Sequence, residues 1–241
     1  MENITESSKL LNDLLLQLQG ASKEYLGSYF SNAPIWLLEN LQIIKLKKDF
    51  EFIREETRVE AIYILTDGIV KAIDYRFMGN SYDYMWFYPI KSFGAMEVLL
   101  DLEQFQTTLS TMTPCTMLIV PINIYKKWVK NDITALSMEV KSMGTFLLEE
   151  VKRERVFLFM QGFDRVVYML TQIYERTADD NICTIKLTHQ DLADSTGLSL
   201  KTVNRSLKQL EEEQYIHRSG NKILINKEQY MFMKNFIKQK H

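Results

Sequence analysis

The 241-residue sequence has only two cysteines, which excludes a framework of disulfide bonds. Cys115 and Cys183 each lie in an apolar, strand-like run. This placement is typical of reduced, buried thiols in a cytoplasmic protein. Histidine is also scarce, with three residues that all follow residue 188, and the chain lacks a phosphate-binding glycine loop and a nucleophile elbow. We therefore expect neither an enzyme nor a metal site.

Long apolar runs are absent as well. No stretch approaches the ~18 uninterrupted apolar residues that a membrane-spanning helix needs. Residues 1–20 have no basic leader region, and polar residues interrupt their leucines, so they predict an amphipathic helix rather than a signal peptide. These absences predict a soluble, cytoplasmic protein with no membrane partner.

The chain also lacks an overall excess of positive charge. Its formal net charge is −2, so no chain-wide field would attract nucleic acid. The average conceals an asymmetry, because residues 199–241 contain nine basic and four acidic side chains and carry +5, against −7 for the residues before them. Any surface that binds nucleic acid must therefore be local, and the C-terminal region can supply one.

The composition that is present is globular, with 46% hydrophobic and 25% charged residues over a length sufficient for two domains. Residues 1–37 predict short helices with a break at 31–34. Residues 38–121 alternate β-rich runs with turn formers, which predicts a small sandwich or roll. Residues 122–160 have a helical pattern, and residues 161–241 form a further domain. Strands are expected at 60–65, 69–74, 82–88 and 115–120, and turns at 66–68 and 78–81.

The helical region contains an apolar stripe with the spacing of a coiled-coil seam. Its members follow one another at steps of three, four, three and four residues, and are Ile133, Leu136, Val140, Met143 and Leu147. Glu150 and Glu154 interrupt the next two positions. Such a stripe is either the core face of a domain helix or the contact of a dimer, and by itself it favours the core face.

Residues 188–207 carry the pattern of a helix-turn-helix. Ala193 stands where two crossing helices leave room for only a small side chain. Gly197 stands at the turn, which needs a positive φ that glycine adopts without steric cost. Val203 returns to pack on the first helix. Small, glycine and branched residues at these offsets predict a helix-turn-helix rather than an ordinary helical hairpin.

The second helix of this motif is expected to lie in the major groove of DNA with its first turns toward the base edges. Thr188 and Ser199 can cap the two helices. Arg205 can donate two parallel bonds to guanine, and Asn204 can pair with adenine or hold a phosphate. Thr188 and Lys208 are expected at phosphates. The complete predicted DNA-binding set is Thr188, Ser199, Lys201, Thr202, Asn204, Arg205, Lys208, Arg218 and Lys222.

Residues 215–225 predict a wing beyond this helix. They form two short β-rich runs around a turn at 219–221. Arg218 and Lys222 are placed to meet the DNA backbone, where each neutralised phosphate makes binding more sensitive to salt. A final helix is expected at 226–237.

The order of these elements resembles the Crp/Fnr family of transcription regulators. Residues 48–56 and 62–70 resemble the opening strands of the family's cyclic-nucleotide-binding-type roll, and residues 93–100 resemble its ligand-facing short helix. The resemblance covers nearly the whole chain after about residue 38. It implies an α+β fold with an N-terminal, jelly-roll-like β-roll, a long dimerisation helix and a C-terminal winged helix-turn-helix domain.

The same resemblance implies a function and a set of partners. In the family the helix after the roll is the dimer contact, so the stripe from Ile133 to Leu147 is expected at a homodimer interface. We predict a dimeric, sequence-specific transcription regulator that binds a near-palindromic operator in double-stranded DNA, with RNA polymerase as a further partner. The alternative is a protein-interaction or scaffold module with a degenerate helix-turn-helix.

Several departures from the family pattern bear on the effector. Ala95 follows Gly94 where the cyclic-AMP-binding members have glutamate, and Phe105 and Gln106 stand where they have arginine and serine. Without that arginine the pocket has no bidentate phosphate clamp, so cyclic AMP is not the expected effector.

Two other cofactors of the family are not expected either. The N-terminal cysteine cluster of the oxygen-sensing members is missing, which excludes an iron-sulfur cluster. Haem is not expected, because His189 and His217 both fall in the DNA-binding domain.

The effector pocket of the roll is predicted only as a set of candidates. These are Tyr84, Trp86, Gly94, Glu97, Phe105 and Gln106. The aromatic run 82–88 either lines a site for a planar or apolar molecule or packs in the core of the roll. Glu97 has either a role in the pocket or a structural role. The roll therefore senses an unknown small molecule or has lost ligand binding.

Two further departures concern turns and the reading helix. Asp49 and Glu56 replace turn glycines of the family, so those turns must differ or carry strain. Leu200 and Lys201 stand where many members have arginine and glutamate, so the target sequence should differ from the familiar ones.

Overall fold

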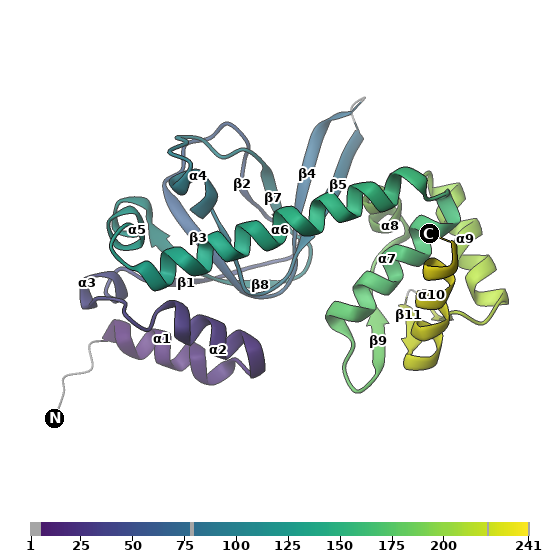
Figure 1. Ribbon diagram of the computed structural model, residues 1–241, viewed down its shortest axis with the longest axis horizontal. Coiled ribbons are helices and arrows are strands. Elements are labelled where there is room, and N and C mark those ends of the chain that lie inside the picture. Colours follow the sequence, from purple (N-terminus) through teal and green to yellow (C-terminus); the bar gives the residue numbers. More distant parts are fainter. Residues whose placement is uncertain (1–5, 78–79, 221, 241) are drawn as a thin grey trace. The chain divides into compact units, whose positions relative to one another are not determined.

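A computed structural model describes residues 6–77, 80–220 and 222–240 of the chain, without the side chains of 6–9, 74–84 and 153–158. The chain divides into two compact units, one formed by residues 1–73 and 85–148 and the other by residues 74–84 and 149–241. Figure 1 labels most of the elements of both units. The predicted α+β class is confirmed, whereas the finer division at residues 37, 121 and 160 stays a prediction.

The first unit begins with three helices, as the sequence predicts. They are α1 (Glu6–Gln17), α2 (Gly20–Tyr29) and α3 (Ile35–Leu38). The break before α3 lies at Pro34, whose extended backbone starts the helix and which cannot continue the previous one. Leu26 and Leu37 are fully buried. These helices therefore belong to the hydrophobic core of the unit.

Two four-stranded antiparallel sheets form the β-roll. One has the order β1-β8-β3-β6 and the other the order β2-β7-β4-β5. The predicted roll architecture is thus confirmed. The elements are β1 (Gln42–Leu46), β2 (Glu51–Ile53), β3 (Ala61–Asp67), β4 (Val70–Phe77), β5 (Asn80–Phe87), β6 (Lys91–Phe93), α4 (Ala95–Leu99), β7 (Thr108–Thr111) and β8 (Cys115–Pro121).

Branched apolar residues of the strands form a large part of the core of the roll. Ile62 and Ile64 of β3, Val70 of β4 and Leu118 of β8 are buried. Strands β3 and β8 pair directly, and Ile64 lies opposite Leu118. The predicted turn at 66–68 has Gly68 at φ 94°, and the predicted turn at 78–81 lies partly outside the described residues.

The turns that lack the family's glycines keep a left-handed backbone. Asp49 has φ 60° and Glu56 has φ 66°. Cross-strand hydrogen bonds hold both, because Asp49 N donates to Thr111 O at 2.8 Å and Glu56 N donates to Phe105 O at 2.9 Å. The sequence predicted that these turns either differ from the family's turns or carry backbone strain. The positive φ of both residues supports backbone strain.

The predicted helical region is two helices, α5 (Ile122–Val129) and α6 (Ile133–Phe159). Asp132 separates them and starts α6, because its Oδ1 accepts hydrogen bonds from the backbone N of Thr134 at 3.0 Å and of Ala135 at 3.1 Å. Its Oδ2 accepts a bond from Trp128 Nε1 at 3.0 Å. This local capping interrupts what the sequence pattern presents as one continuous helical region.

A buried carboxylate joins α6 to three other elements of the first unit. Oε1 of Glu139 accepts hydrogen bonds from Tyr29 of α2 at 2.5 Å, Ser92 of β6 at 2.7 Å and Tyr125 of α5 at 3.2 Å. Burial, followed by the nearby Glu139 charge, raises the pKa of Tyr29 well above its usual value. The phenol therefore stays protonated and remains a donor to the carboxylate.

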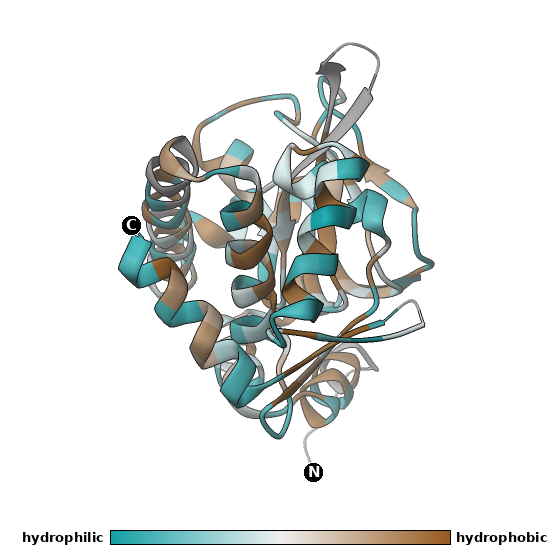
Figure 2. Ribbon diagram, turned by 90° about the vertical axis from the view of Figure 1, so that its right-hand side faces the viewer, coloured by the Kyte–Doolittle hydropathy of each residue, from teal (hydrophilic) through white to brown (hydrophobic). Residues whose placement is uncertain are grey.

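The second unit contains the C-terminal helices and a small sheet of order β10-β11-β9. The predicted two-stranded wing is present, with β9 as a third strand. Figure 2 shows apolar and polar residues alternating along the helices. The elements are α7 (Gly162–Thr177), β9 (Ile182–Ile185), α8 (His189–Thr196), α9 (Leu200–Glu212), β10 (His217–Ser219), β11 (Lys222–Asn226) and α10 (Lys227–Lys240).

Two lysines of α10 pair with carboxylates of α7. Lys240 Nζ lies 2.8 Å from Oδ1 of the buried Asp164, and Lys234 Nζ lies 2.6 Å from Glu175 Oε1. These pairs hold the middle and the C-terminal end of α10 against α7. Within the described ranges, no helix combines the length and apolarity required to cross a bilayer.

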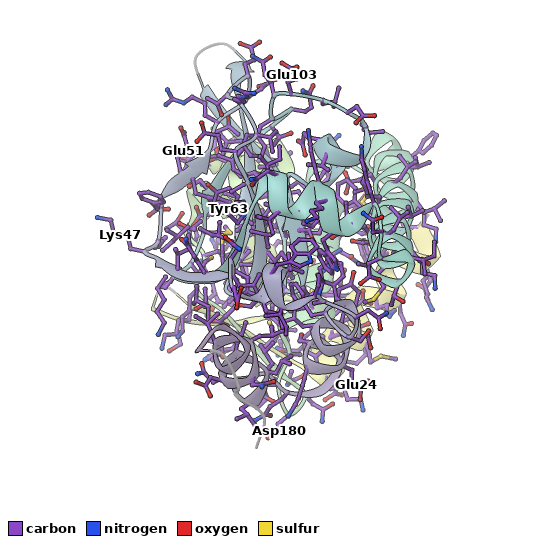
Figure 3. All side chains as sticks on the ribbon, turned by 90° about the vertical axis from the view of Figure 1, so that its left-hand side faces the viewer. Glu24, Lys47, Glu51, Tyr63, Glu103 and Asp180 are labelled. Carbon is purple, nitrogen blue, oxygen red and sulfur yellow. The ribbon has the colours of Figure 1, made fainter. Side chains whose placement is uncertain are left out.

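We predict that Asp49→Gly raises the free energy of unfolding by about 0.5–1 kcal/mol, because the left-handed backbone costs about 1–2 kcal/mol at a residue with a Cβ. Chemical denaturation measures the change. Lys47→Gly is the control, since Lys47 projects outward in Figure 3 and has no positive φ. That variant should lose stability through a more flexible unfolded chain. A loss in Asp49→Gly as well would contradict the prediction.

Candidate nucleic-acid interface

The two helices of the predicted motif are α8 and α9, and both have the expected caps. Thr188 Oγ1 accepts a hydrogen bond from Asp191 N at 3.0 Å, and Asp191 Oδ2 accepts one from Thr188 N at 2.8 Å. This reciprocal pair is a capping box. Ser199 Oγ accepts a bond from Thr202 N at 3.2 Å. Both helix starts are therefore determined by side chains that the sequence identifies.

The turn between the helices has the predicted geometry. Gly197 has φ 67° and ψ 27°, the left-handed conformation that ends α8. Ala193 and Val203 are buried on the facing sides of the two helices. The predicted turn conformation of Gly197 is thus confirmed, and the burial of Ala193 and Val203 agrees with the positions assigned to them from the sequence.

One face of α9 is buried in the domain. Val203, Leu207 and Leu210 are fully buried, and α9 packs on α7 and α8. Gly162 at the start of α7 allows a close approach, because a Cβ built there would lie 3.1 Å from Cγ2 of Thr202. This packing decides which side of α9 remains outside.

The opposite face of α9 presents the predicted readers. Lys201, Asn204, Arg205 and Lys208 are all exposed. No acidic residue occurs between 199 and 210, so this face is cationic along its first turns. The one described ion pair here, between Lys208 Nζ and Glu212 Oε1 at 3.6 Å, joins two well-exposed side chains and is therefore weak.

Three of the predicted contact residues also have roles at the starts of α8 and α9. Thr202 is half-buried, and its hydroxyl lies 2.9 Å from Ser199 Oγ. The hydroxyl of Thr188 is used in its capping box. We infer that Thr188, Ser199 and Thr202 primarily position α8 and α9.

The wing places its two basic residues differently. Lys222 is exposed, whereas Arg218 is half-buried and forms an ion pair with Glu211 of α9. Arg218 Nε donates to Glu211 Oε2 at 2.7 Å. This hydrogen bond holds the pKa of Glu211 below its usual value. The sequence analysis did not foresee this pair, which competes with a phosphate for the guanidinium.

The sequence prediction also omitted one exposed apolar residue of α9. Leu200, the first residue of the helix, has 43% of its surface exposed. Its position directly after the Ser199 cap is the signal that could have identified it, because the start of this helix is where base edges are expected.

Several of the candidate pocket residues are buried in the roll, whereas Gln106 is exposed. Phe105 is buried beside Gly94, where an added Cβ would lie 3.3 Å from Phe105 Cε1. Glu97 is also buried, and its Oε1 accepts a 3.3 Å hydrogen bond from Gln106 N. These contacts bring Gly94 to Phe105 and Glu97 to Gln106, and they support the structural role of Glu97.

The two remaining pocket candidates come from β5. Trp86 is buried, and its indole N–H has no hydrogen-bond partner among the described residues. The side chain of Tyr84 lies outside the described residues. No group of three or more potential metal ligands occurs in the part of the chain that the structure describes.

The geometry of the second unit defines a winged helix-turn-helix domain, and comparison with known proteins agrees. Residues 164–231 match the family of Crp-like helix-turn-helix domains. No curated protein matches the chain in sequence.

Solved structures share the fold over most of the chain. FixK2 from Bradyrhizobium japonicum has a TM-score of 0.67 at 20% identity, covering 80% of this chain and 96% of its own. A CRP/FNR-family transcriptional regulator from Thermus thermophilus has a TM-score of 0.69 at 17% identity, covering 83% and 100%. The c-di-GMP responsive global regulator CLP from Xanthomonas campestris has a TM-score of 0.67 at 15% identity, covering 84% and 98%.

These findings confirm the resemblance to the Crp/Fnr family of transcription regulators. The chain carries a Crp-like helix-turn-helix domain and has the fold of Crp/Fnr regulators. Two of the three structures are named as regulators.

We predict that Glu211→Gln strengthens DNA binding at low salt, because it releases Arg218 to pair with a phosphate. The plot of log K against log salt should steepen by about 0.9 for one added phosphate contact. Fluorescence anisotropy over a series of salt concentrations measures the slope.

Glu213→Gln is the matched control, since it removes the same charge from the exposed end of α9 where the described contact is to Gln209. Equal slopes for the two variants, or an unchanged effect of Glu211→Gln when Arg218 is alanine, would show that Arg218 is not the residue released.

Proposed function

We propose that this chain is a dimeric transcription regulator that reads an operator sequence with α9. The observation that carries the proposal is the division of α9 into a buried face, with Val203, Leu207 and Leu210, and an exposed face that carries Arg205 and the other predicted readers. A helix held in this way can enter the major groove with its first turns toward the bases.

The exposed side chains suit two kinds of DNA contact. Arg205 has the fork geometry for guanine O6 and N7, and Asn204 has the amide for adenine. Lys208 and Lys222 suit phosphates, which orient the protein without reading sequence. A cytoplasmic location and a contact with RNA polymerase are the parts of the proposal that come from the family resemblance.

The exposed side of α6 supports a homodimer. The α6 seam (Ile133, Leu136, Val140, Met143 and Leu147) includes side chains that are 77%, 56% and 63% exposed at Ile133, Val140 and Leu147. Ala135 and Glu139, on a different side of the same helix, are buried. An exposed apolar seam with heptad spacing is stabilised when a second helix covers it.

A two-fold dimer of this kind would present two copies of α9. Such symmetry matches a near-palindromic operator with half-sites about one helical turn of DNA apart. The homodimer and the operator symmetry are therefore one proposal, because each requires the other.

The roll either senses a small molecule other than a cyclic nucleotide or has lost ligand binding. By the family resemblance, Phe105 stands where the cyclic-AMP-binding members have the arginine that clamps the phosphate, and it is buried beside Gly94. The charged partner that a cyclic phosphate needs is then missing. The indole N–H of Trp86, which has no partner among the side chains that the structure describes, supports a ligand that offers a hydrogen-bond acceptor within an aromatic setting.

Arg205→Ala is expected to cost about 1–3 kcal/mol of DNA affinity at one base pair per half-site and to relax specificity there. Selection of operators from randomised DNA, followed by titration at fixed salt, measures both effects. Lys208→Ala is the control, since loss of a phosphate contact should weaken binding equally for all sequences. A variant that binds the best operator as tightly as the wild type would exclude Arg205 as a reader. Absence of DNA binding by an intact dimer would support the scaffold alternative.

Val140→Asp is expected to raise the dimer dissociation constant more than tenfold, because it places a charge in the centre of the α6 seam. Sedimentation equilibrium measures the change, and operator binding should weaken with it. Thr145→Asp adds the same charge at an exposed position of α6 outside the seam and should leave the dimer unchanged. If both variants remain equally dimeric, α6 does not form the interface.

A further inference from the structure

We propose that a groove beside the start of α6 is a second contact surface of the homodimer, filled by the same region of a second copy of the chain. This inference rests on the homodimer proposed above and adds a surface that the α6 seam does not include. The walls of the groove contain Asn32, Pro34, Trp36, Asn131, Asp132 and Ile133.

Two parts of the first unit that are distant in the sequence form the groove. The connection from α2 to α3 supplies one wall together with α3, and the connection from α5 to α6 supplies the other. Figure 1 shows α3 and α5 near the end of α6 at which that helix begins. The groove has a volume of about 410 Å³, which is enough for several side chains.

The groove is continuous with the α6 seam. Ile133 is the first residue of the seam and also lines the groove, and 77% of its surface is exposed. In a parallel two-fold pair, like positions of the two helices meet. A second copy that covers the seam therefore also brings the start of its own α6 to the groove.

The α6 seam by itself is small for a stable dimer. It contains five residues over two heptads, whereas the pattern of a coiled coil is sustained over at least about three heptads. A standard protein interface has roughly 20–30 residues on each side. The homodimer therefore needs further contact surface, and the groove supplies it directly beside the seam.

The same region presents a side chain that can fill a groove. Ile35 lies between Pro34 and Trp36 in the chain and is 63% exposed. A two-fold interface uses one patch of surface on both copies, so that patch must offer both a projection and a recess. Ile35 and the groove meet this requirement, and each copy inserts its Ile35 into the groove of the other.

The polar side chains of the groove favour an apolar occupant. Asn32 Nδ2 donates to Thr134 Oγ1 at 3.3 Å, and Asn131 Nδ2 donates to Lys127 O at 2.7 Å. The carboxylate of Asp132 accepts three hydrogen bonds from the chain itself. Because these groups already have partners, the groove offers a polar small molecule less than it offers a branched apolar side chain.

The experiment places a charge on the projecting side chain. Ile35→Asp should raise the dimer dissociation constant at least about tenfold in sedimentation equilibrium, because the carboxylate would have to enter an apolar contact. Leu100→Asp is the matched control, since Leu100 at the end of α4 is 61% exposed and lies outside both the groove and the seam. That variant should dimerise as the wild type does, and circular dichroism checks that both variants are folded.

A mixture of two variants tests whether the groove receives Ile35. Asn131→Lys places a cation at the wall of the groove, where it can pair with the carboxylate of Ile35→Asp in the other copy. The two full-length variants should therefore associate with each other more strongly than Ile35→Asp associates with itself. An equal or weaker association of the mixture would overturn the insertion of Ile35 into the groove.

The remaining outcomes separate this proposal from the proposed function. Equal dimerisation of Ile35→Asp and Leu100→Asp, with Val140→Asp monomeric, would overturn the groove as an interface and leave the α6 homodimer standing. A wild-type chain that remains monomeric at every concentration would overturn both.

Discussion

Burial of one face of α9 is the interaction on which the proposed DNA binding depends. Val203, Leu207 and Leu210 pack against α7 and α8, and each buried side chain of this size contributes about 1.5–3 kcal/mol relative to exposure. Rotating α9 to hide its cations would lose all of that burial. The positive φ of Gly197 and the Ser199 cap fix the point at which the helix begins. Within its domain, the cationic face is therefore presented by the packing of the opposite face in the core.

The long helix α6 meets two different demands on two of its sides. One side carries Ala135 and Glu139, which are buried, and the carboxylate of Glu139 accepts bonds from α2, α5 and β6. Such a buried carboxylate is tolerated because several donors compensate for its lost hydration. The other side is the α6 seam, whose apolar residues remain largely exposed. The helix is thus anchored in the roll, while Ile133, Val140 and Leu147 of its seam stay exposed.

The roll shows how a fold persists while its site chemistry changes. Asp49 and Glu56 adopt the backbone that glycine would take more easily, and cross-strand bonds retain both turns. Phe105, an apolar residue, is buried beside Gly94. A shared fold therefore carries no ligand with it, and the effector has to be argued from the site.

Elements with a local cause could be predicted from the order of residues alone. The caps Thr188 and Ser199, the turn at Gly197 and the succession of strands and helices each depend on residues a few positions apart, so spacing and side-chain chemistry were enough. The pairing of Arg218 with Glu211, the partial exposure of Leu200 and the filling of the roll by Phe105 emerged only from the folded chain. Only the folded chain also shows that the apolar stripe of α6 lies on a different side of the helix from the residues buried against the roll. Exposure and partner choice depend on which distant segments pack together, and no local pattern records that.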